Sequence, residues 1–292
     1  MKKIRLLMNE PPTDWNSRMG PAIGACNDIY FLKNQPWLEV KNTSIEQCKK
    51  DDVIPWVRYG CQSELRQCEE LGIKMIVGPN CVFGNSNNPL ANERELRSPA
   101  IYRLLMSDEV NGDMARKYVK QFGGYEVERV QQVPYFMRPE LYKEPFYYKH
   151  KWDCYYHIKT GINKFTRSAF KTITATFHGW YDFCELKHKA RHSAVCLHGC
   201  HYDNYGLAVH EISILGCPLV YDKDGIKRGA VGEGMGVEVS KMETNTPEEA
   251  KEIIEAAKKA MTMDRKKVYE ASMEFQSISN CFRRYKKALG VD

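Results

Sequence analysis

The sequence predicts an α/β protein made of two halves, each a parallel β-sheet whose strands are joined by helices. Short apolar runs, which are typical of buried strands, alternate along the chain with segments of helical periodicity. A stretch dense in proline, tyrosine and lysine at residues 138–152 interrupts this alternation, which then resumes. Because strands that alternate with helices form parallel sheets with crossover connections, we expect two such sheets separated by a linker.

The first half begins with a buried strand in the run KKIRLLMN, residues 2–9. A loop rich in proline and glycine follows this strand, and a helix is expected from about Ala25. Further strands are expected at 74–80 and 100–107, a helix at 108–123, and a closing segment at 127–136.

The second half repeats the alternation. Its best-marked helix is residues 246–261, in which Thr246 is an N-cap, acidic residues fill the first turn and lysines fill the last. A final helix is expected at about 264–288. The other strands are expected at 153–159, 174–179, 194–199, 217–222 and 235–240, and the other helices at 164–173, at 181–193 and from about Gly206.

Composition indicates an ordinary globular protein. Of the 292 residues, 27% are charged and 43% are hydrophobic, and a chain of this length can bury a large core. The eleven cysteines are scattered and no secretory signal is visible, so we expect reduced thiols in a cytoplasmic protein. No run approaches the ~20 apolar residues of a membrane span. The net charge of +6 suits an anionic small molecule, a nucleic acid or an acidic membrane surface without choosing among them.

Two acidic residues, Asp203 and Glu211, follow the expected strand at 194–199. Asn204 and Gly206 between them are poor inside a helix and favourable in a turn or cap, so Asp203 is expected in a loop and Glu211 in the second turn of a helix. A strand, a turn and a helix N-terminus together form an anion site, because free backbone N–H groups and the helix dipole face the ligand. A plain strand-to-helix turn is the alternative interpretation.

The same segment resembles the Glu-x7-Glu signature of retaining GT-B glycosyltransferases, notably those of family 4. That signature usually reads E-G-F-G-L, three residues, E-A-M-A, one residue and G-x-P-V-V. The family's spacing is preserved, with Asp in place of Glu at the first acid. Asp203 stands at the first acid, Tyr205 at the aromatic residue, Gly206 and Leu207 at Gly-Leu, Glu211 at the second acid, and Gly216 and Pro218 at the turn before the next strand.

A second likeness lies upstream, where this family commonly carries Arg, four residues and Lys after the first strand of its C-terminal domain. Lys159 and Lys164 have that spacing and that place, with Lys in the Arg position. A point-charge contact with phosphate would then replace a bidentate grip. The resemblance implies that the two lysines clamp the diphosphate of the donor. Arg167 is a competing candidate, and a solvated surface pair is the alternative interpretation.

The N-terminal half resembles the family less closely. In such enzymes the loop after the first strand is rich in glycine and approaches the donor or the acceptor, and residues 17–24 occupy that place. Arg18 and Gly20 are the candidate contacts in this loop, and Tyr205 is a third candidate in the second half. The segment 127–136 stands where the family reads V-x-V-I-P-N-G, although the Asn-Gly pair is absent.

The resemblance implies a GT-B fold, in which two Rossmann-like domains face a central cleft. Ligands of open α/β sheets bind outside the carboxyl ends of the strands, so the site is expected in that cleft. The expected division is an acceptor-side N-terminal domain at 1–140, a nucleotide-sugar donor domain at 141–275, and a C-terminal helix at 276–292 that returns to the first domain.

The activity that the resemblance implies is the transfer of a sugar from a nucleotide-diphosphate sugar to an acceptor, with retention at the anomeric carbon. The leaving diphosphate develops negative charge during this reaction. Lys159, Lys164 and the amides near Gly206 and Leu207 would stabilise that charge, so no metal and no other cofactor is expected.

The two acids are the candidate catalytic residues. By the resemblance, Glu211 would bind the ribose hydroxyls of the nucleotide, and Asp203 would hold hydroxyls of the donor sugar. Neither role needs a carboxylate nucleophile, so the two-carboxylate scheme of glycosidases fits poorly.

The acceptor is expected to be a glycan or a glycoconjugate, but other functions remain. The basic, aromatic stretch at 142–152 and the net charge also permit a DNA-modifying glycosyltransferase that acts on a modified base. The same stretch fits a solvated hinge, and peripheral contact with a membrane through a basic patch is a further alternative. A third hypothesis is a non-catalytic protein that binds nucleotide sugars or nucleic acid on the same scaffold.

Two other motifs have simpler interpretations. CLHGCH at 196–201 offers zinc ligands, but its spacing matches no common zinc finger and it lies on an expected buried strand. GEGMG at 232–236 imitates a dinucleotide fingerprint, but it precedes a strand instead of a helix. His178 and His198, at expected strand ends, are either ligand contacts or hydrogen-bonded structural residues.

Overall fold

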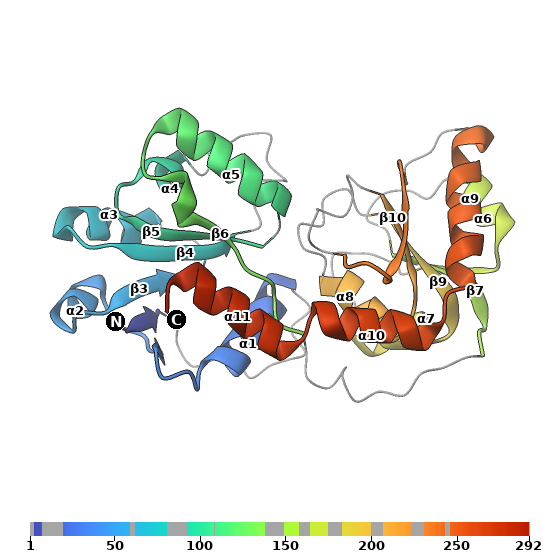
Figure 1. Ribbon diagram of the computed structural model, residues 1–292, viewed down its shortest axis with the longest axis horizontal. Helices are drawn as coiled ribbons and strands as arrows, with labels where there is room; N and C mark the ends of the chain where they lie inside the picture. Colours follow the sequence, from blue (N-terminus) through green and yellow to red (C-terminus); the bar gives the residue numbers. More distant parts are fainter. Residues whose placement is uncertain are drawn as a thin grey trace. The chain divides into compact units, whose positions relative to one another are not determined.

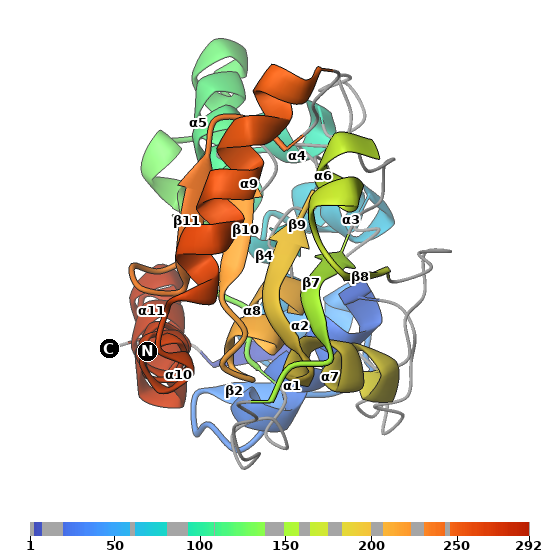
Figure 2. The ribbon, with the colours of Figure 1, turned by 90° about the vertical axis from the view of Figure 1, so that its right-hand side faces the viewer.

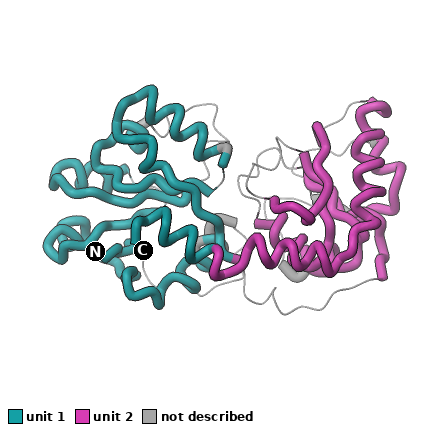
Figure 3. The backbone as a smooth tube through the Cα atoms, in the orientation of Figure 1, with its two compact units in different colours: residues 1–15, 24–136, 281–292 teal, residues 16–23, 137–280 magenta. Residues whose placement is uncertain are grey.

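The computed structural model groups the chain into two compact units (Figure 3). Unit 1 comprises Met1–Trp15, Gly24–Phe136 and Cys281–Asp292, and unit 2 comprises Asn16–Ile23 and Met137–Asn280. The residues that the structure describes are 3–7, 20–58, 62–80, 93–107, 109–137, 149–157, 164–174, 183–199, 207–222, 231–242 and 246–291.

The sheet of unit 1 has six parallel strands in the order β2-β1-β3-β4-β5-β6 (Figure 1). The chain moves outward from β1 to β2 and then returns past β1 to β3, so the order reverses between β1 and β3. In open sheets of this kind, ligands bind near such a reversal, outside the carboxyl ends of the strands. The strands are β1 (Ile4–Leu6), β2 (Leu38–Val40), β3 (Ile54–Val57), β4 (Met75–Asn80), β5 (Ile101–Met106) and β6 (Val130–Gln132).

Helices cover both faces of this sheet. Val57 of β3 belongs to a buried core that strands β4 and β5 share with helices α2 to α5. The preceding residue, Trp56, points to the opposite face, where its ring lies 6.3 Å from that of Tyr285 in α11. The helices are α1 (Gly20–Leu32), α2 (Ile45–Lys50), α3 (Gln62–Leu71), α4 (Glu93–Arg97), α5 (Glu109–Phe122) and α11 (Ile278–Leu289). Helix α1 belongs to unit 1 from Gly24 onward, and α11 from Cys281 onward.

Strands β2 and β3 fall outside the elements that the sequence predicts. Each is too short to show a period of two. In β2, Glu39 and Val40 are half-buried, so the strand lacks a continuous apolar run. In β3, Pro55 has no N–H to donate to the sheet and argues against a strand.

Helices α2, α3 and α4 also fall outside the elements that the sequence predicts. The elements of unit 1 that it does predict follow the expected order. The strands expected at 74–80 and 100–107 are confirmed as β4 and β5, and the helix expected at 108–123 is confirmed as α5. Helix α1 begins at Gly20, earlier than the expected start near Ala25.

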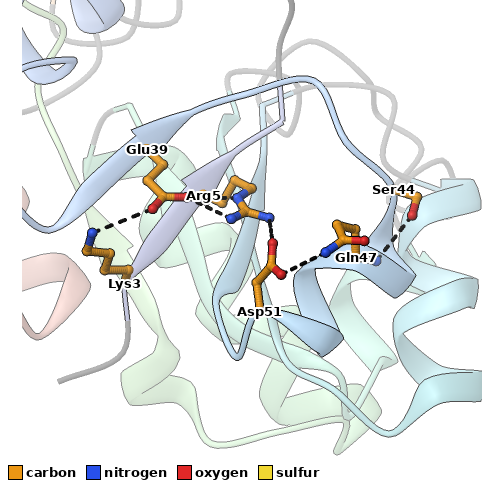
Figure 4. Close-up of polar contacts among 6 residues, drawn as sticks. All are labelled: Lys3, Arg5, Glu39, Ser44, Gln47 and Asp51. Atoms are coloured by element: carbon orange, nitrogen blue, oxygen red, sulfur yellow. Dashed lines mark hydrogen bonds and ion pairs between the residues drawn. The ribbon is translucent and has the colours of Figure 1, made fainter.

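A network of charges joins β1, β2 and α2 in unit 1 (Figure 4). The buried guanidinium of Arg5 donates to Glu39 Oε2 from Nε and Nη2, at 3.0 and 2.8 Å. Its Nη1 donates to Asp51 Oδ2 at 2.6 Å, and Asp51 is the C-cap residue of α2. Gln47 Nε2 donates to the other oxygen of Asp51 at 2.7 Å. Arg5 therefore connects two parallel strands and the end of a helix.

Acidification is expected to weaken unit 1 through this network. The hydrogen bonds from Arg5 lower the pKa of Glu39 and of Asp51. Because both pKa values are lower in the folded state, the stabilisation is complete above the unfolded values of about 4.3 and 3.9 and is lost as the pH falls through the folded values. Between about pH 5 and about pH 2, the urea midpoint of the wild type should fall further than that of Arg5→Met. Equal falls would contradict this account.

The sheet of unit 2 has five parallel strands in the order β11-β10-β9-β7-β8. The chain moves outward from β7 to β8 and returns past β7 to β9, so the order reverses between β7 and β9 (Figure 2). The strands are β7 (Trp152–His157), β8 (Thr172–Thr174), β9 (Ser193–His198), β10 (Leu219–Asp222) and β11 (Gly236–Val239).

Two helical layers accompany the sheet of unit 2 (Figure 2). Helix α9 packs against α6 and strands β9, β10 and β11, whereas α8 packs against α7 and α10. Thr246 closes a capping box with Glu249 at the start of α9, which confirms the cap that the sequence predicts. The helices are α6 (Lys164–Ala169), α7 (Phe183–Arg191), α8 (Leu207–Ser213), α9 (Pro247–Met261) and α10 (Arg265–Phe275).

Two predictions for the second half are wrong in detail. The helix expected at 164–173 ends at Ala169, and Thr172–Thr174 forms strand β8, because its β-branched residues favour an extended strand. The single helix expected at 264–288 is two helices, α10 and α11, separated by Gln276 and Ser277. The strands expected at 153–159, 194–199, 217–222 and 235–240 correspond to β7, β9, β10 and β11. The strand expected at 174–179 lies outside the described residues from residue 175 onward. No helix in the described ranges is long and apolar enough to cross a membrane.

Candidate functional site

The reversal of strand order in unit 2 positions the candidate site. Strands β7 and β9 are neighbours there, and their last residues, His157 and His198, are paired in the parallel register. The chain segment after β7 leads to α6, and the segment after β9 leads to α8. Because both segments start from the carboxyl ends of adjacent strands at the reversal, they start from the edge where ligands of open sheets bind.

Most of the predicted site residues follow these two strands in the sequence, whereas Arg18 and Gly20 belong to the N-terminal half. Lys164 is the first residue of α6, Leu207 is the first residue of α8, and Glu211 lies in the second turn of α8, as expected. Gly20 is the first residue of α1. Arg18, Lys159, Asp203, Tyr205 and Gly206 lie outside the described residues.

Helix α8 carries Glu211 into the interior of unit 2. The side chains from Ala208 to Ser213 are all buried, and Glu211 is only 1% exposed. Burial raises the pKa of Tyr155 on β7, and the Glu211 carboxylate is among the smaller contributors to that shift. A buried carboxylate is costly without polar partners, so Glu211 requires polar neighbours at this position.

Helix α10 fixes α8 through the residue that precedes Glu211. The ring of His210 is fully buried, and Gln276 Nε2 lies 3.1 Å from each of its ring nitrogens. The ring of Phe275 stacks on the ring of His210, with centroids 5.7 Å apart and ring planes 13° apart. Gln276 ends α10 and bonds His210, which explains why the expected final helix is interrupted there.

Two further contacts fasten the end of α8. Ser213 Oγ lies 2.9 Å from Ser272 Oγ, a hydroxyl pair on facing helices. The buried Arg265 at the start of α10 donates to three main-chain carbonyls, those of Ser193 at 2.7 Å, and of Ala190 and Leu215 at 3.4 Å. Arg265 thereby ties the turn after α8 to the start of β9. The position of Glu211 is set by packing against α10 as well as by its own short helix.

Packing also explains the glycines of GEGMG. A Cβ at Gly232 would lie 2.8 Å from the ring of Phe275, and Gly234 has a φ of +81°, which favours glycine. At Gly236 a Cβ would collide with the carbonyl oxygen of Leu219 in β10. The motif precedes strand β11, as expected. These glycines serve the approach of α10 and β10, which supports the rejection of a dinucleotide fingerprint.

The CLHGCH motif shows no zinc site in the part of the chain that the structure describes. Cys196 and His198 are buried in β9, while residues 200 and 201 lie outside the described residues. Among the described residues, no group of three or more His, Cys, Asp or Glu side chains could hold a metal ion. His178 also lies outside the described residues.

Sequence reasoning missed a buried ion pair in unit 1. Arg58, directly after β3 at the reversal of that sheet, pairs with Asp28 of α1, and their side chains are 3% and 1% exposed. Phe136 N donates to Asp28 Oδ1 at 3.5 Å, and Asn27 Nδ2 donates to Phe136 O at 2.7 Å. The ring of Tyr135 lies 5.8 Å from the guanidinium. The sequence feature that could have indicated this ion pair is the polar pair Asn27-Asp28 inside an otherwise apolar helix.

Comparisons with known proteins identify the fold. No protein-family model matches the chain, and no curated protein sequence matches it. Solved structures do match over the whole chain. HepE of Anabaena, in complex with UDP and glucose, is 9% identical with a TM-score of 0.53, covering 100% of both chains. Sucrose-phosphate synthase of Thermosynechococcus elongatus is 10% identical with a TM-score of 0.59, again covering 100% of both chains.

A third similar structure is trehalose-6-phosphate synthase OtsA, which is 12% identical with a TM-score of 0.58 and is matched over 100% of this chain and 99% of its own. Identities this low establish the fold alone. The two parallel sheets, each with a reversal of strand order, agree with that fold. The chain therefore has the GT-B fold of two Rossmann-like α/β domains.

Proposed function

We propose that this protein is a glycosyltransferase that moves a sugar from a nucleotide-diphosphate sugar to an acceptor. One observation carries the proposal: the second acid of the glycosyltransferase signature, Glu211, is buried on the helix that follows β9, at the strand reversal of the second sheet. The similar HepE structure contains UDP and glucose, and the two synthases of similar fold are named for sugar-phosphate products.

The donor diphosphate is assigned to residues at that reversal. Lys159 and Lys164 supply positive charge, and Gly206 and Leu207 supply backbone N–H groups. Charge of this kind stabilises a leaving diphosphate in the transition state. With two lysines available, the reaction is proposed to need no metal. Arg167, in the same helix as Lys164, is the alternative cation.

The two acids hold the rest of the donor. Glu211 binds the ribose hydroxyls and Asp203 binds hydroxyls of the sugar, as in the family-4 enzymes that the motif resembles. Tyr205, two positions after Asp203 in the sequence, Arg18, and Gly20 at the start of α1 contact the donor or the acceptor. The transfer is proposed to retain the anomeric configuration, with a glycan or glycoconjugate as acceptor.

A transfer assay tests this function. The protein is incubated with a set of nucleotide-diphosphate sugars and a mixture of glycan acceptors, and released nucleoside diphosphate is measured with and without EDTA. We expect one donor to be consumed at a rate that EDTA leaves unchanged, and an NMR spectrum of the product should show the donor's anomeric configuration. A donor that binds but is never consumed with any acceptor would favour the non-catalytic hypothesis.

A further inference from the structure

A cluster of cationic and aromatic side chains lies at the amino end of the sheet in unit 2. It combines the residues that lead into β7 with the end of α7 and the residue before β9, and these two chain segments lie side by side (Figure 2). We call it the basic cluster. Its members are Lys149, His150, Lys151, Trp152, His188, Arg191 and His192.

Main-chain hydrogen bonds hold the two segments together. The N–H groups of Lys151 and Trp152 both donate to the carbonyl of His192, at 2.8 and 3.1 Å. Since this pairing involves the backbone, it fixes the cluster without using the charged ends of its side chains. The backbone of unit 2 therefore holds the residues of the cluster together.

An indole lies among the imidazoles of the cluster. Trp152 contacts His188 and His192 in edge-to-face geometry, with ring centroids 5.8 and 6.4 Å apart. The two imidazoles are 4.7 Å apart, one helical turn from each other. His150, Lys151, Lys149 and His188 are exposed, and Trp152 is half-buried, so an indole bordered by cations reaches the surface.

Cations dominate the surroundings of the imidazoles. Burial lowers the pKa of His192, and Lys151, His188 and Arg191 lower it further, opposed by a hydrogen bond with the backbone of Lys149. Burial and then Arg265 lower the pKa of His150, with Asp153 opposing and His192 adding to the shift. Asp153 accepts a hydrogen bond from Lys171 N at 2.8 Å, and Glu185 is paired with Lys189. The cluster thus contains three permanent cations and three histidines.

We propose that the basic cluster is a docking surface for the phosphate head groups of an anionic membrane. Lysine and arginine side chains near a surface of anionic lipid are attracted to it, and an indole with one polar edge suits the membrane interface. Single-stranded nucleic acid would require an aromatic face on which bases stack, but the ring of Trp152 is already in contact with two imidazoles. Charge suits either phosphate, and the contacts of this indole therefore favour lipid over single-stranded nucleic acid.

The location of the cluster leaves the donor site of unit 2 accessible. The cluster surrounds the amino ends of β7 and β9, whereas the candidate site follows the carboxyl ends of the same two strands. Docking through the cluster would not cover the segments that carry the lysines and acids of the site. The inference does not depend on the proposed transfer reaction.

Vesicle sedimentation tests the proposal on the full chain. The wild type should sediment with vesicles of phosphatidylglycerol and phosphatidylcholine and should remain in solution with phosphatidylcholine alone. The exposed double variant Lys149→Glu/Lys151→Glu should lose at least about tenfold in partitioning, since each basic residue near an anionic surface contributes roughly fivefold. The control Lys258→Glu/Lys259→Glu makes the same charge change on exposed residues of α9 and should sediment as the wild type does.

Vesicle sedimentation at a series of pH values tests the contribution of the histidines. Partitioning should rise as the pH falls below the ordinary histidine pKa of about 6.5, because burial lowers the pKa of His150. It should rise less in His150→Gln, whose replaced residue is exposed. Equal sedimentation of the cluster variant and the α9 control would overturn the proposal. So would a cluster variant that loses affinity for a single-stranded DNA oligonucleotide while keeping its affinity for vesicles, because the partner would then be nucleic acid.

Discussion

Replacing Arg58 with methionine is expected to lower the free energy of unfolding of unit 1 by about 3 to 5 kcal/mol. The substitution leaves Asp28 as a buried carboxylate whose side chain is 1% exposed, and an uncompensated buried charge is far more costly than the pair itself. Asp28 also accepts from the backbone of Phe136, which lies between the rings of Phe31 and Tyr285 at 4.9 and 5.3 Å. The loss should therefore be measured as a lower urea midpoint of unit 1.

A double variant separates the two contributions to that loss. Asp28→Asn/Arg58→Met removes both charges, and its unfolding free energy should lie closer to that of the wild type than the single variant does. Arg116→Met is the matched control, because Arg116 forms an exposed pair with Asp113, at 37% and 54% exposure, and should cost about 0.5 kcal/mol or less. If Arg58→Met costs no more than Arg116→Met, the ion pair does not organise the interior of unit 1.

Replacing Glu211 with glutamine is expected to weaken binding of the nucleotide donor by roughly 10- to 100-fold. Glutamine keeps the size of the side chain but removes the negative charge, and hydrogen bonds to a charged group contribute about 1.5 to 3 kcal/mol each. The effect should be large because Glu211 is buried and its helix is held by His210, Gln276 and Arg265. Isothermal titration with the preferred nucleoside diphosphate measures it.

The control for Glu211 is an acidic residue of the same unit. Glu238 is exposed on β11, so Glu238→Gln removes the same charge outside the candidate site and should leave the dissociation constant unchanged. Circular dichroism should show that both variants fold. A Glu211→Gln variant that folds and binds the nucleotide as tightly as the wild type would remove this residue from the donor site.

Local signals in the sequence were sufficient for most of the fold. Helix α9 carries its own cap, acidic first turn and basic last turn, and strands such as β4 and β5 are apolar runs bounded by turn residues. Two parallel sheets follow from the alternation of such elements. The elements that were missed include helices α2, α3 and α4 and strands β2 and β3. The two strands are stabilised by their neighbours, as the register of β1 with both shows.

The surroundings of the candidate site could be predicted only in part. The spacing in the sequence placed Glu211 in the second turn of a helix, which the structure confirms. Its roles and those of the other site residues stay predictions. The contact between His210 and Gln276 joins residues 66 positions apart, and no periodicity connects them. The same holds for Arg58 and Asp28, which meet only because β3 and α1 are neighbours in the folded unit.

A thermal-shift panel tests the central claim most directly. UDP, GDP, ADP, CMP and their common sugar conjugates are added to the wild type without metal and then with Mg²⁺. A ligand at about a hundred times its dissociation constant adds roughly 2.7 kcal/mol of stability, so the preferred nucleotide should raise the melting temperature clearly, and equally without metal. If none of these ligands shifts the melting temperature, the protein has no nucleotide-sugar donor site, and the account of Glu211 and its helix as part of one is wrong.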